Sequence, residues 1–207
     1  MADSLTLAGE ALVCRRGGRQ IFSGLGFALP AGGALAVTGR NGAGKSSLLR
    51  MIAGLLRIEG GTLTLAGGDK ERSIGEQAHY LGHQDALKPS LSVIENLDFW
   101  SAWLGGAEPG GGDARAALAA VGLDTIAALP ASYLSAGQKR RLSLARLVAI
   151  PRPIWLLDEP FSALDAPAQT ALMSLMREHL GKGGMIVAAT HADIAIDGIR
   201  ELQIGPA

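Results

Sequence analysis

Residues 34–47 read ALAVTGRNGAGKSS, a short apolar run followed directly by a glycine-rich loop. The apolar run predicts a buried strand, and the helical pattern that begins near Gly44 predicts a helix behind the loop. Positions 39–46 match G-x-x-x-x-G-K-[ST], the spacing of loops whose backbone N–H groups surround phosphate oxygens. The composition of this chain gives about 0.01 chance matches to that pattern. The stretch therefore predicts a strand, a phosphate-binding loop and a helix in succession.

The residues of this loop have separate expected tasks. Lys45 would reach the β- and γ-phosphates of a nucleoside triphosphate, and the Ser46 hydroxyl would ligate Mg²⁺. Unpaired N–H groups and the positive end of the helix dipole would add to the attraction for phosphate. The residues expected to bind the nucleotide here are Gly39, Arg40, Asn41, Gly42, Ala43, Gly44, Lys45, Ser46 and Ser47.

Strand patterns alternate with helix patterns along the chain, which indicates an α/β fold. The continuous apolar runs at 154–157 and 185–189 fit central strands of a parallel sheet that is buried on both faces. Shorter strands are expected at 5–7, 11–15, 27–29 and 62–65, and helices at about 92–104, 113–121, 136–149 and 167–180. Residues 86–150 contain helix patterns without a convincing strand, so we expect a helical lobe inserted into the α/β core.

Composition narrows the classes of protein. The chain has 207 residues, 19 Lys+Arg and 19 Asp+Glu, so its net charge of zero argues against a broad nucleic-acid-binding surface. Its 48% hydrophobic content is enough for one domain with a substantial core. Cys14 is the only cysteine, which excludes an internal disulfide and suggests a reduced cytosolic setting. It is expected to be a small buried apolar residue and not a haem or metal ligand.

Two carboxylates, Asp158 and Glu159, follow the apolar strand at 154–157. Open α/β sheets bind their ligands at the carboxyl ends of the strands. Asp158 would hold Mg²⁺ through water or hydrogen bonds, and Glu159 would orient and deprotonate the attacking water. The alternative interpretation is that the two acids form an inert, solvated turn. The presence of a phosphate loop in the same chain favours the catalytic interpretation over this one.

The pentapeptide Leu134–Gln138 reads LSAGQ and precedes a helix. Ser135 fits the N-cap position of that helix, so a purely structural role is one interpretation. A helix N-terminus with Ser135 and the backbone of Gly137 is also a good seat for an anion.

Together these motifs resemble those of the ATP-binding-cassette (ABC) ATPases. The phosphate loop at 39–46, Gln84, the LSAGQ segment at 134–138, the strand and acid pair at 154–159, Asp165 and His191 occur in the family's order. The resemblance implies a P-loop NTPase (RecA-like) core with an N-terminal antiparallel β subdomain and an inserted helical lobe. The single domain 1–207 would comprise a core at 1–85 and 151–207 and a lobe at 86–150.

The family resemblance also implies roles and partners. ATP and Mg²⁺ would be the cofactors, and two copies would pair head to tail so that Ser135, Gly137 and Gln138 of one face the nucleotide of the other. Gln84 would contact Mg²⁺ or the water, His191 would sense the γ-phosphate, and Asp165 would lie at the dimer seam. The remaining histidines, His79, His83 and His179, are expected to be structural or surface residues.

Integral membrane subunits are the second class of partner that the resemblance implies. The surface after Gln84 would receive them, with a docking groove drawn from Lys88, Leu91, Phe99 and Trp103. One stripe of the helix expected at 92–104 is formed by Val93, Leu97, Trp100 and Leu104, and packing of that stripe in the core of the lobe is the alternative.

A narrower resemblance is to the ATP-binding subunits of the haem exporters of cytochrome c maturation. It is carried by Val13–Arg15, Leu81–Gln84, Glu95–Leu97, Arg140–Arg141 and Trp155–Phe161. It implies a peripheral protein on the cytoplasmic side of the inner membrane, whose ATP hydrolysis drives release of haem from a periplasmic haem chaperone or haem export. No residue of this sequence indicates direct haem binding. Another small bacterial ABC exporter, a soluble non-transport ABC ATPase and a nucleotide-binding module without turnover are the alternatives.

The chain departs from the ABC pattern at one point. The family offers an aromatic residue near the first strands to stack on adenine, whereas this chain has Arg15 and Arg16 there. The planar guanidinium of Arg15 or Arg16 could stack on the base instead, and the sequence leaves open which group does so.

Overall fold

The computed structural model describes residues 5–105, 113–191 and 194–205. The chain divides into two compact units. The first unit is made of residues 1–82, 153–160 and 176–207, and the second of residues 83–152 and 161–175.

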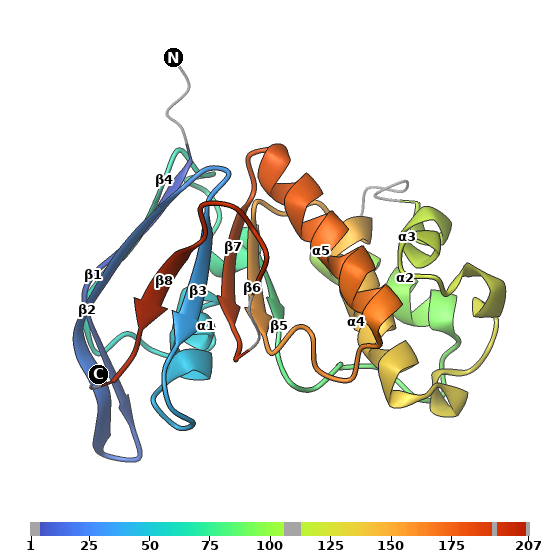
Figure 1. Ribbon diagram of the computed structural model, residues 1–207, viewed down its shortest axis with the longest axis horizontal. Helices are drawn as coiled ribbons and strands as arrows, with labels where there is room; N and C mark the ends of the chain where they lie inside the picture. The colour runs from blue at the N-terminus through green and yellow to red at the C-terminus, as the bar shows by residue number, and fades with distance from the viewer. Residues whose placement is uncertain (1–4, 106–112, 192–193, 206–207) are drawn as a thin grey trace. The chain divides into compact units, whose positions relative to one another are not determined.

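The first unit contains two β-sheets (Figure 1). One is a three-stranded antiparallel sheet in the order β2-β1-β4, whose strands are Arg19–Pro30, Thr6–Arg16 and Gly60–Ala66. The other is a five-stranded parallel sheet in the order β5-β6-β7-β3-β8, whose strands are Ala78–Leu81, Ile154–Asp158, Met185–Ala189, Ala34–Thr38 and Arg200–Gln203.

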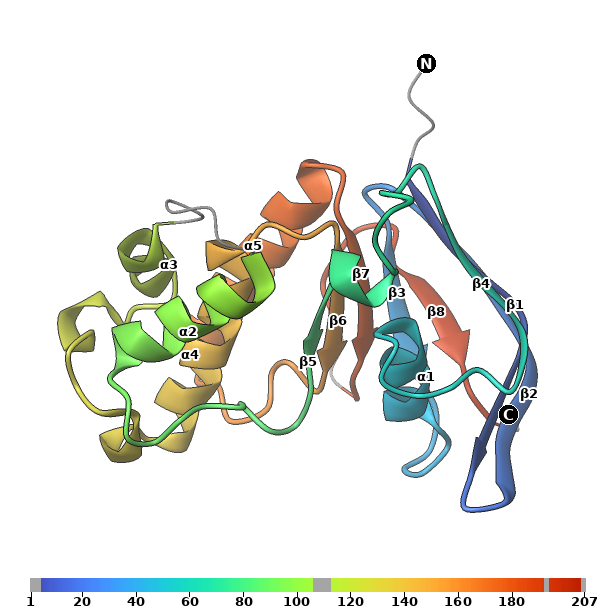
Figure 2. The same cartoon turned by 180° about the vertical axis from the view of Figure 1, so that it is seen from behind.

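Helix α1 (Lys45–Ile52) lies between the two sheets (Figure 2). Its buried residues Leu48, Leu49, Met51 and Ile52 share one core with apolar side chains of both sheets. Strands β6 and β7 are buried at all five positions, as expected for central strands of a parallel sheet. Apolar packing therefore holds α1 from two sides, and this helix begins at Lys45 of the predicted phosphate loop.

The fold confirms the expected α/β class, and it corrects four details of the strands. The predicted segments 5–7 and 11–15 are one strand, β1, which passes through an irregularity where Ala11 has a φ of 48°. Strand β2 begins eight residues before the expected segment 27–29. Strands β5 and β8 have no counterpart in the sequence prediction, because each has four residues and β8 is polar and mostly exposed.

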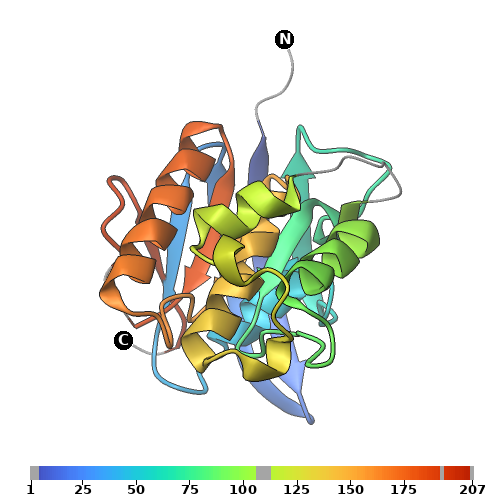
Figure 3. The same cartoon turned by 90° about the vertical axis from the view of Figure 1, so that its right-hand side faces the viewer.

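The second unit is helical (Figure 3). Its helices are α2 (Val93–Gly105), α3 (Ala114–Ala120), α4 (Ala136–Ala149) and the first part of α5 (Ala166–Gly181), all close to the predicted ranges. Asp113 caps α3 and Ser135 caps α4 through their side chains. In the part of the chain that the structure describes, no helix has the length and apolar character needed to cross a bilayer.

Candidate nucleotide site

The phosphate loop joins β3 to α1 through backbone conformations that only glycine adopts easily. Gly39 has a φ of 133°, and a Cβ there would lie 2.3 Å from the carbonyl oxygen of Ile204. Gly44 has a φ of 113°, and a Cβ there would lie 2.5 Å from Cγ2 of Ile21. Gly44 is also the N-cap of α1, and no described side chain caps that helix. The loop thus leaves the first N–H groups of α1 available to an anion.

Lys45 lies across the loop and meets His191. Its ammonium donates to the carbonyl oxygens of Gly39 at 2.7 Å and Arg40 at 3.4 Å, and it lies 3.2 Å from Nε2 of His191. The same Nε2 lies 2.9 Å from Oδ1 of Asn41. One ring nitrogen cannot accept from Lys45 and donate to Asn41 at the same time, so the two contacts belong to different tautomers. In either tautomer the imidazole is held against the loop.

The acid pair lies at the carboxyl end of β6. Asp158 is the last residue of the strand and is 2% exposed. Glu159 follows with a φ of 46° and donates its N–H to the carbonyl of Ala189 at the end of β7. Its carboxylate accepts a hydrogen bond from the Thr190 hydroxyl at 3.3 Å and lies 3.9 Å from Nε2 of His191.

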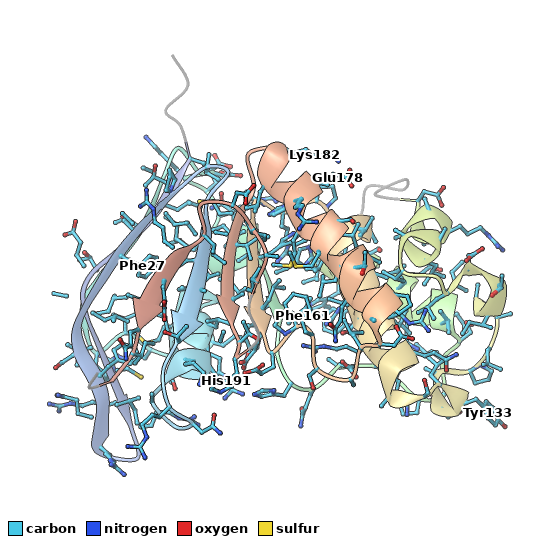
Figure 4. The ribbon with its side chains drawn as sticks, in the orientation of Figure 1. Phe27, Tyr133, Phe161, Glu178, Lys182 and His191 are labelled. Carbon is cyan, nitrogen blue, oxygen red and sulfur yellow. The ribbon has the colours of Figure 1, made fainter. Side chains whose placement is uncertain are left out.

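Sheet order explains why these groups meet. Strand β7 is bonded to β6 on one side and to β3 on the other, so three neighbouring strands end at one edge. The loops that follow them carry Glu159, His191 and Lys45, and Figure 4 labels His191 at that edge. A parallel sheet therefore gathers side chains that lie up to 146 residues apart in the sequence.

The residues at this edge suit Mg²⁺ bound together with phosphates. The expected donors, the Ser46 hydroxyl and the buried Asp158 carboxylate, are hard oxygen ligands of the kind that Mg²⁺ prefers. The described part of the chain has no cluster of three or more His, Cys, Asp or Glu that could hold a metal ion. Mg²⁺ commonly uses one or two protein ligands and takes the rest from phosphates and water.

The other predicted site residues belong to the second unit. Ser135 and Gln138 form a capping box at the start of α4: the Ser135 hydroxyl accepts from the Gln138 N–H at 3.2 Å, and Oε1 of Gln138 accepts from the Ser135 N–H at 2.8 Å. A Cβ at Gly137 would lie 2.9 Å from the carbonyl oxygen of Ala163. Gln84 is exposed. The roles of these residues at a nucleotide stay predictions.

Sequence reasoning missed Thr190 as a member of the site. Its hydroxyl orients the Glu159 carboxylate from the end of the neighbouring strand. The available signal was its position between the buried run at 185–189 and His191. Arg15 and Arg16, the expected substitutes for an adenine-stacking aromatic, are both exposed on β1.

Cys14 and His179, two of the groups predicted to be structural, are packed in the first unit, whereas His83 is exposed in the second. Cys14 is fully buried, and burial raises the pKa of its thiol, with a hydrogen bond from Ser47 acting in the opposite direction. A buried thiol with a raised pKa is a poor nucleophile and metal ligand. His179 stacks on Trp155 with ring centroids 3.9 Å apart, and burial lowers its pKa.

Comparison with known proteins places this geometry in a family. Residues 22–162 match the ABC transporter family. The chain belongs to the ABC transporter family. It is 61% identical to a Nitrobacter hamburgensis protein over 97% of this chain and 98% of that one, and 63% identical to one from Rhodopseudomonas palustris over 98% and 100%. A Paramagnetospirillum magneticum protein is 50% identical over 99% of this chain and 95% of its own length. All three are named cytochrome c biogenesis ATP-binding export protein CcmA.

Solved structures of ABC proteins share the fold. The ATP-binding subunit of an ABC transporter has a TM-score of 0.79 at 24% identity and covers 89% of this chain and 79% of that one. A bacterial Atm1-family ABC exporter with ATP bound has a TM-score of 0.81 at 22% identity, covering 99% of this chain and 38% of that one. The ABC resemblance inferred from the motifs is therefore confirmed at the level of family and fold.

Proposed function

We propose that the chain binds ATP with Mg²⁺ and hydrolyses it as the ATP-binding subunit of a membrane export complex in cytochrome c biogenesis. The observation that carries the proposal is the convergence of Lys45, Glu159 and His191 at one sheet edge, beside a glycine loop whose helix start is open to an anion. High identity to export proteins of that system over nearly the entire chain supports the biological setting.

Phosphate binding would begin with an exchange of partners at Lys45. The ammonium donates to two carbonyl oxygens of the loop itself, and β- and γ-phosphate oxygens would replace them as stronger, charged acceptors. The N–H groups at the start of α1 and of the loop would surround the phosphates. The Ser46 hydroxyl, and Asp158 through water or hydrogen bonds, would hold Mg²⁺, which would supply positive charge against that of the phosphates.

Hydrolysis would use Glu159 as the base for the attacking water. The Thr190 hydroxyl and the backbone bond to β7 hold Glu159 in a left-handed conformation, which fixes the direction of its carboxylate. Nε2 of His191 lies 3.9 Å from a Glu159 carboxylate oxygen and 3.2 Å from the Lys45 ammonium, and the ring would donate to the γ-phosphate once Lys45 turns to that phosphate. General-base catalysis of this kind contributes about 10²–10⁴-fold to a rate.

The second half of each site would come from another copy of the chain. Ser135, Gly137 and Gln138 would face the γ-phosphate held by the partner's loop, as the family resemblance implies. A charged hydrogen bond is worth about 1.5–3 kcal/mol net, so two per site across two sites give roughly 6–12 kcal/mol. Reversing a two-state population from 1:99 to 99:1 takes about 5.5 kcal/mol, so loss of the γ-phosphate is enough to open the dimer.

A Glu159→Gln variant tests the enzymatic part of the proposal. The amide keeps the size of the side chain and removes the base, so the variant should bind ATP, accumulate as a dimer and hydrolyse at least a hundredfold more slowly. Size-exclusion chromatography with light scattering in Mg-ATP and a phosphate-release assay measure both effects. Turnover at the parental rate by a strictly monomeric variant contradicts the assignment.

The second unit offers a surface for the membrane subunits. Trp103 is 73% exposed and Phe99 37% exposed on α2, and the Lys88 ammonium lies 4.0 Å from the centre of the Phe99 ring. We expect Trp103→Asp to abolish co-purification with the integral membrane subunits while basal hydrolysis continues. Leu55→Asp is the matched control, since Leu55 is an apolar residue of the first unit that is 64% exposed. Equal loss of co-purification in both variants counts against docking at α2.

A further inference from the structure

Asp85, the residue after Gln84, is fastened to helix α4. Its Oδ1 lies 3.4 Å from Nη1 of Arg140 and accepts from the Ser143 hydroxyl at 3.2 Å. Both partners are buried, at 4% and 0% exposure, whereas the Asp85 side chain is 24% exposed. A carboxylate that accepts from a guanidinium and a hydroxyl makes charge-assisted bonds, which are stronger than neutral ones.

The next residue along the chain is fixed as well. The carbonyl oxygen of Ala86 accepts from Nε1 of Trp100 at 3.1 Å, and Ala86 has a φ of 53°. The guanidinium of Arg146 stacks on the Trp100 ring at 4.5 Å. Two successive residues behind Gln84 are therefore tied to α2 and α4 by side-chain contacts.

The electrostatics of this group depend on Asp85. Burial lowers the pKa of Arg146 to about 10; the charge of Arg140 acts in the same direction, and the charge of Asp85 acts against both. Such an ion pair adds little net stability, because the cost of desolvation offsets most of the Coulomb attraction, although removal of Asp85 alone would leave the buried Arg140 charge without its carboxylate and would be destabilising. The arrangement thus points to control of position rather than to stabilisation of the fold.

We propose that Asp85 is a positioning residue for hydrolysis, which acts by fixing Gln84 to the helix that carries Ser135 and Gly137 at its start. The inference rests on the proposed function, in which Gln84 contacts Mg²⁺ or the attacking water. Gln84 and the LSAGQ segment would then move together as parts of the second unit. A displacement of Gln84 by the nucleotide is passed to Ser135 instead of being absorbed in a flexible loop.

A double-mutant cycle on the full-length chain tests the proposal. Asp85→Ala is expected to lower kcat about tenfold and to change KM for ATP less than twofold, because the Asp85 carboxylate is engaged by Arg140 and Ser143 and is not among the residues expected to bind the nucleotide. In a Gln84→Ala background the same change should alter kcat less than twofold, since the residue through which Asp85 acts is gone. Asp98→Asn, at an exposed acid on α2, is the control and should leave both constants unchanged. Single-turnover assays with radiolabelled ATP resolve the slow variants.

Two further variants keep the test informative if Asp85→Ala folds poorly. Asp85→Asn keeps the acceptor oxygen without the charge, and Ser143→Ala removes the hydroxyl from the α4 side; each should lower kcat about threefold, and only when Gln84 is present. Three outcomes would overturn the proposal. The Asp85→Ala and Gln84→Ala variants could reduce kcat by factors that multiply in the double variant, or Gln84→Ala could keep the parental kcat. The third outcome is an effect of Asp85→Ala on KM alone. Failure of the proposed function is distinct, because it appears as parental turnover that does not depend on Glu159.

Discussion

Ser135 has a capping role that the structure shows and a nucleotide-binding role that the sequence predicts, and two substitutions separate the roles. Ser135→Ala removes the acceptor for the Gln138 N–H and breaks the capping box of α4. Ser135→Asp supplies another good capping side chain and puts a negative charge at the positive end of the helix. The first change should weaken the cap, while the second should preserve it.

The expected effects on stability follow from the capping bonds. Loss of a Ser cap costs about 1 kcal/mol, which corresponds to a fall in Tm of about 2–4 °C for a chain of this size. The Asp variant should unfold at the parental Tm or up to about 4 °C above it, because its cap is intact and the helix dipole favours the carboxylate by about 0.3–1 kcal/mol. Differential scanning calorimetry without nucleotide measures both values.

The expected effects on activity have the opposite order. If Ser135 faces the partner's γ-phosphate, the Asp carboxylate meets a like charge there. Two unit charges about 4 Å apart at an effective dielectric constant of 20 repel by about 4 kcal/mol, a factor of about 10³ per site in ATP-dependent pairing. The Ala variant loses one charged hydrogen bond of about 1.5–3 kcal/mol per site, so its ATP-dependent pairing should weaken by about 10–150-fold per site. The assays are light scattering and hydrolysis in Mg-ATP.

The reasoning is refuted if Ser135→Asp pairs and hydrolyses like the parent while Ser135→Ala shows only the thermal shift. Ser135 would then be a helix cap and nothing more, which is the structural interpretation of the LSAGQ segment. The Asp variant is decisive because its folding stability is expected to be intact.

Three further predictions concern the first unit. Gly39→Ala should lower the free energy of unfolding in urea by about 3 kcal/mol or more, because strain at positive φ adds to a clash with a backbone oxygen. The control is Gly54→Ala, at a φ of 72° with nothing within 4 Å of a Cβ, which should cost about 1 kcal/mol. Equal losses of stability in the two variants would contradict the clash. Thr190→Val should lower kcat about tenfold without raising KM for ATP, because it removes the hydroxyl that orients Glu159; a parental kcat would exclude that role. Burial lowers the pKa of His179 below its ordinary 6.5, so the unfolded chain takes up the proton first as the pH falls. The free energy of unfolding therefore decreases as the pH drops below about 6.5. Urea titrations at pH 7.5 and 5.5 should show a smaller decrease for His179→Phe than for the parent.

Local patterns predicted most of the elements. The helix expected at 136–149 has those bounds, since Ser135 supplies an N-cap and the pattern of apolar residues continues without a breaker. The central strands at 154–158 and 185–189 were evident because burial on both faces leaves continuous apolar runs. Edge strand β8 was not, because its partly solvated residues Arg200–Gln203 show neither an apolar run nor alternation.

Local sequence patterns could not predict which distant segments of the chain contact one another in the site. The phosphate loop, Glu159 and His191 were each recognisable from neighbouring residues, but the 3.2 Å approach of His191 to Lys45 depends on the order of β6, β7 and β3. Thr190 escaped notice for the same reason, since its partner Glu159 lies 31 residues earlier.

The two kinds of site residue differ in what the fold must supply to them. Lys45, Glu159 and His191 need only a parallel sheet with its strands in the right order, because the sheet brings the three loops to one edge. Gln84 has no strand or helix of its own to hold it, and its exposed position would leave its side chain free to sample many directions. Under the proposed function Gln84 contacts Mg²⁺ or the attacking water, and such a group must be fixed to contribute to a rate, since a misplacement of about 1 Å costs about a hundredfold. In our proposal the ion pair between Asp85 and the buried Arg140 would supply that constraint from the next residue along the chain.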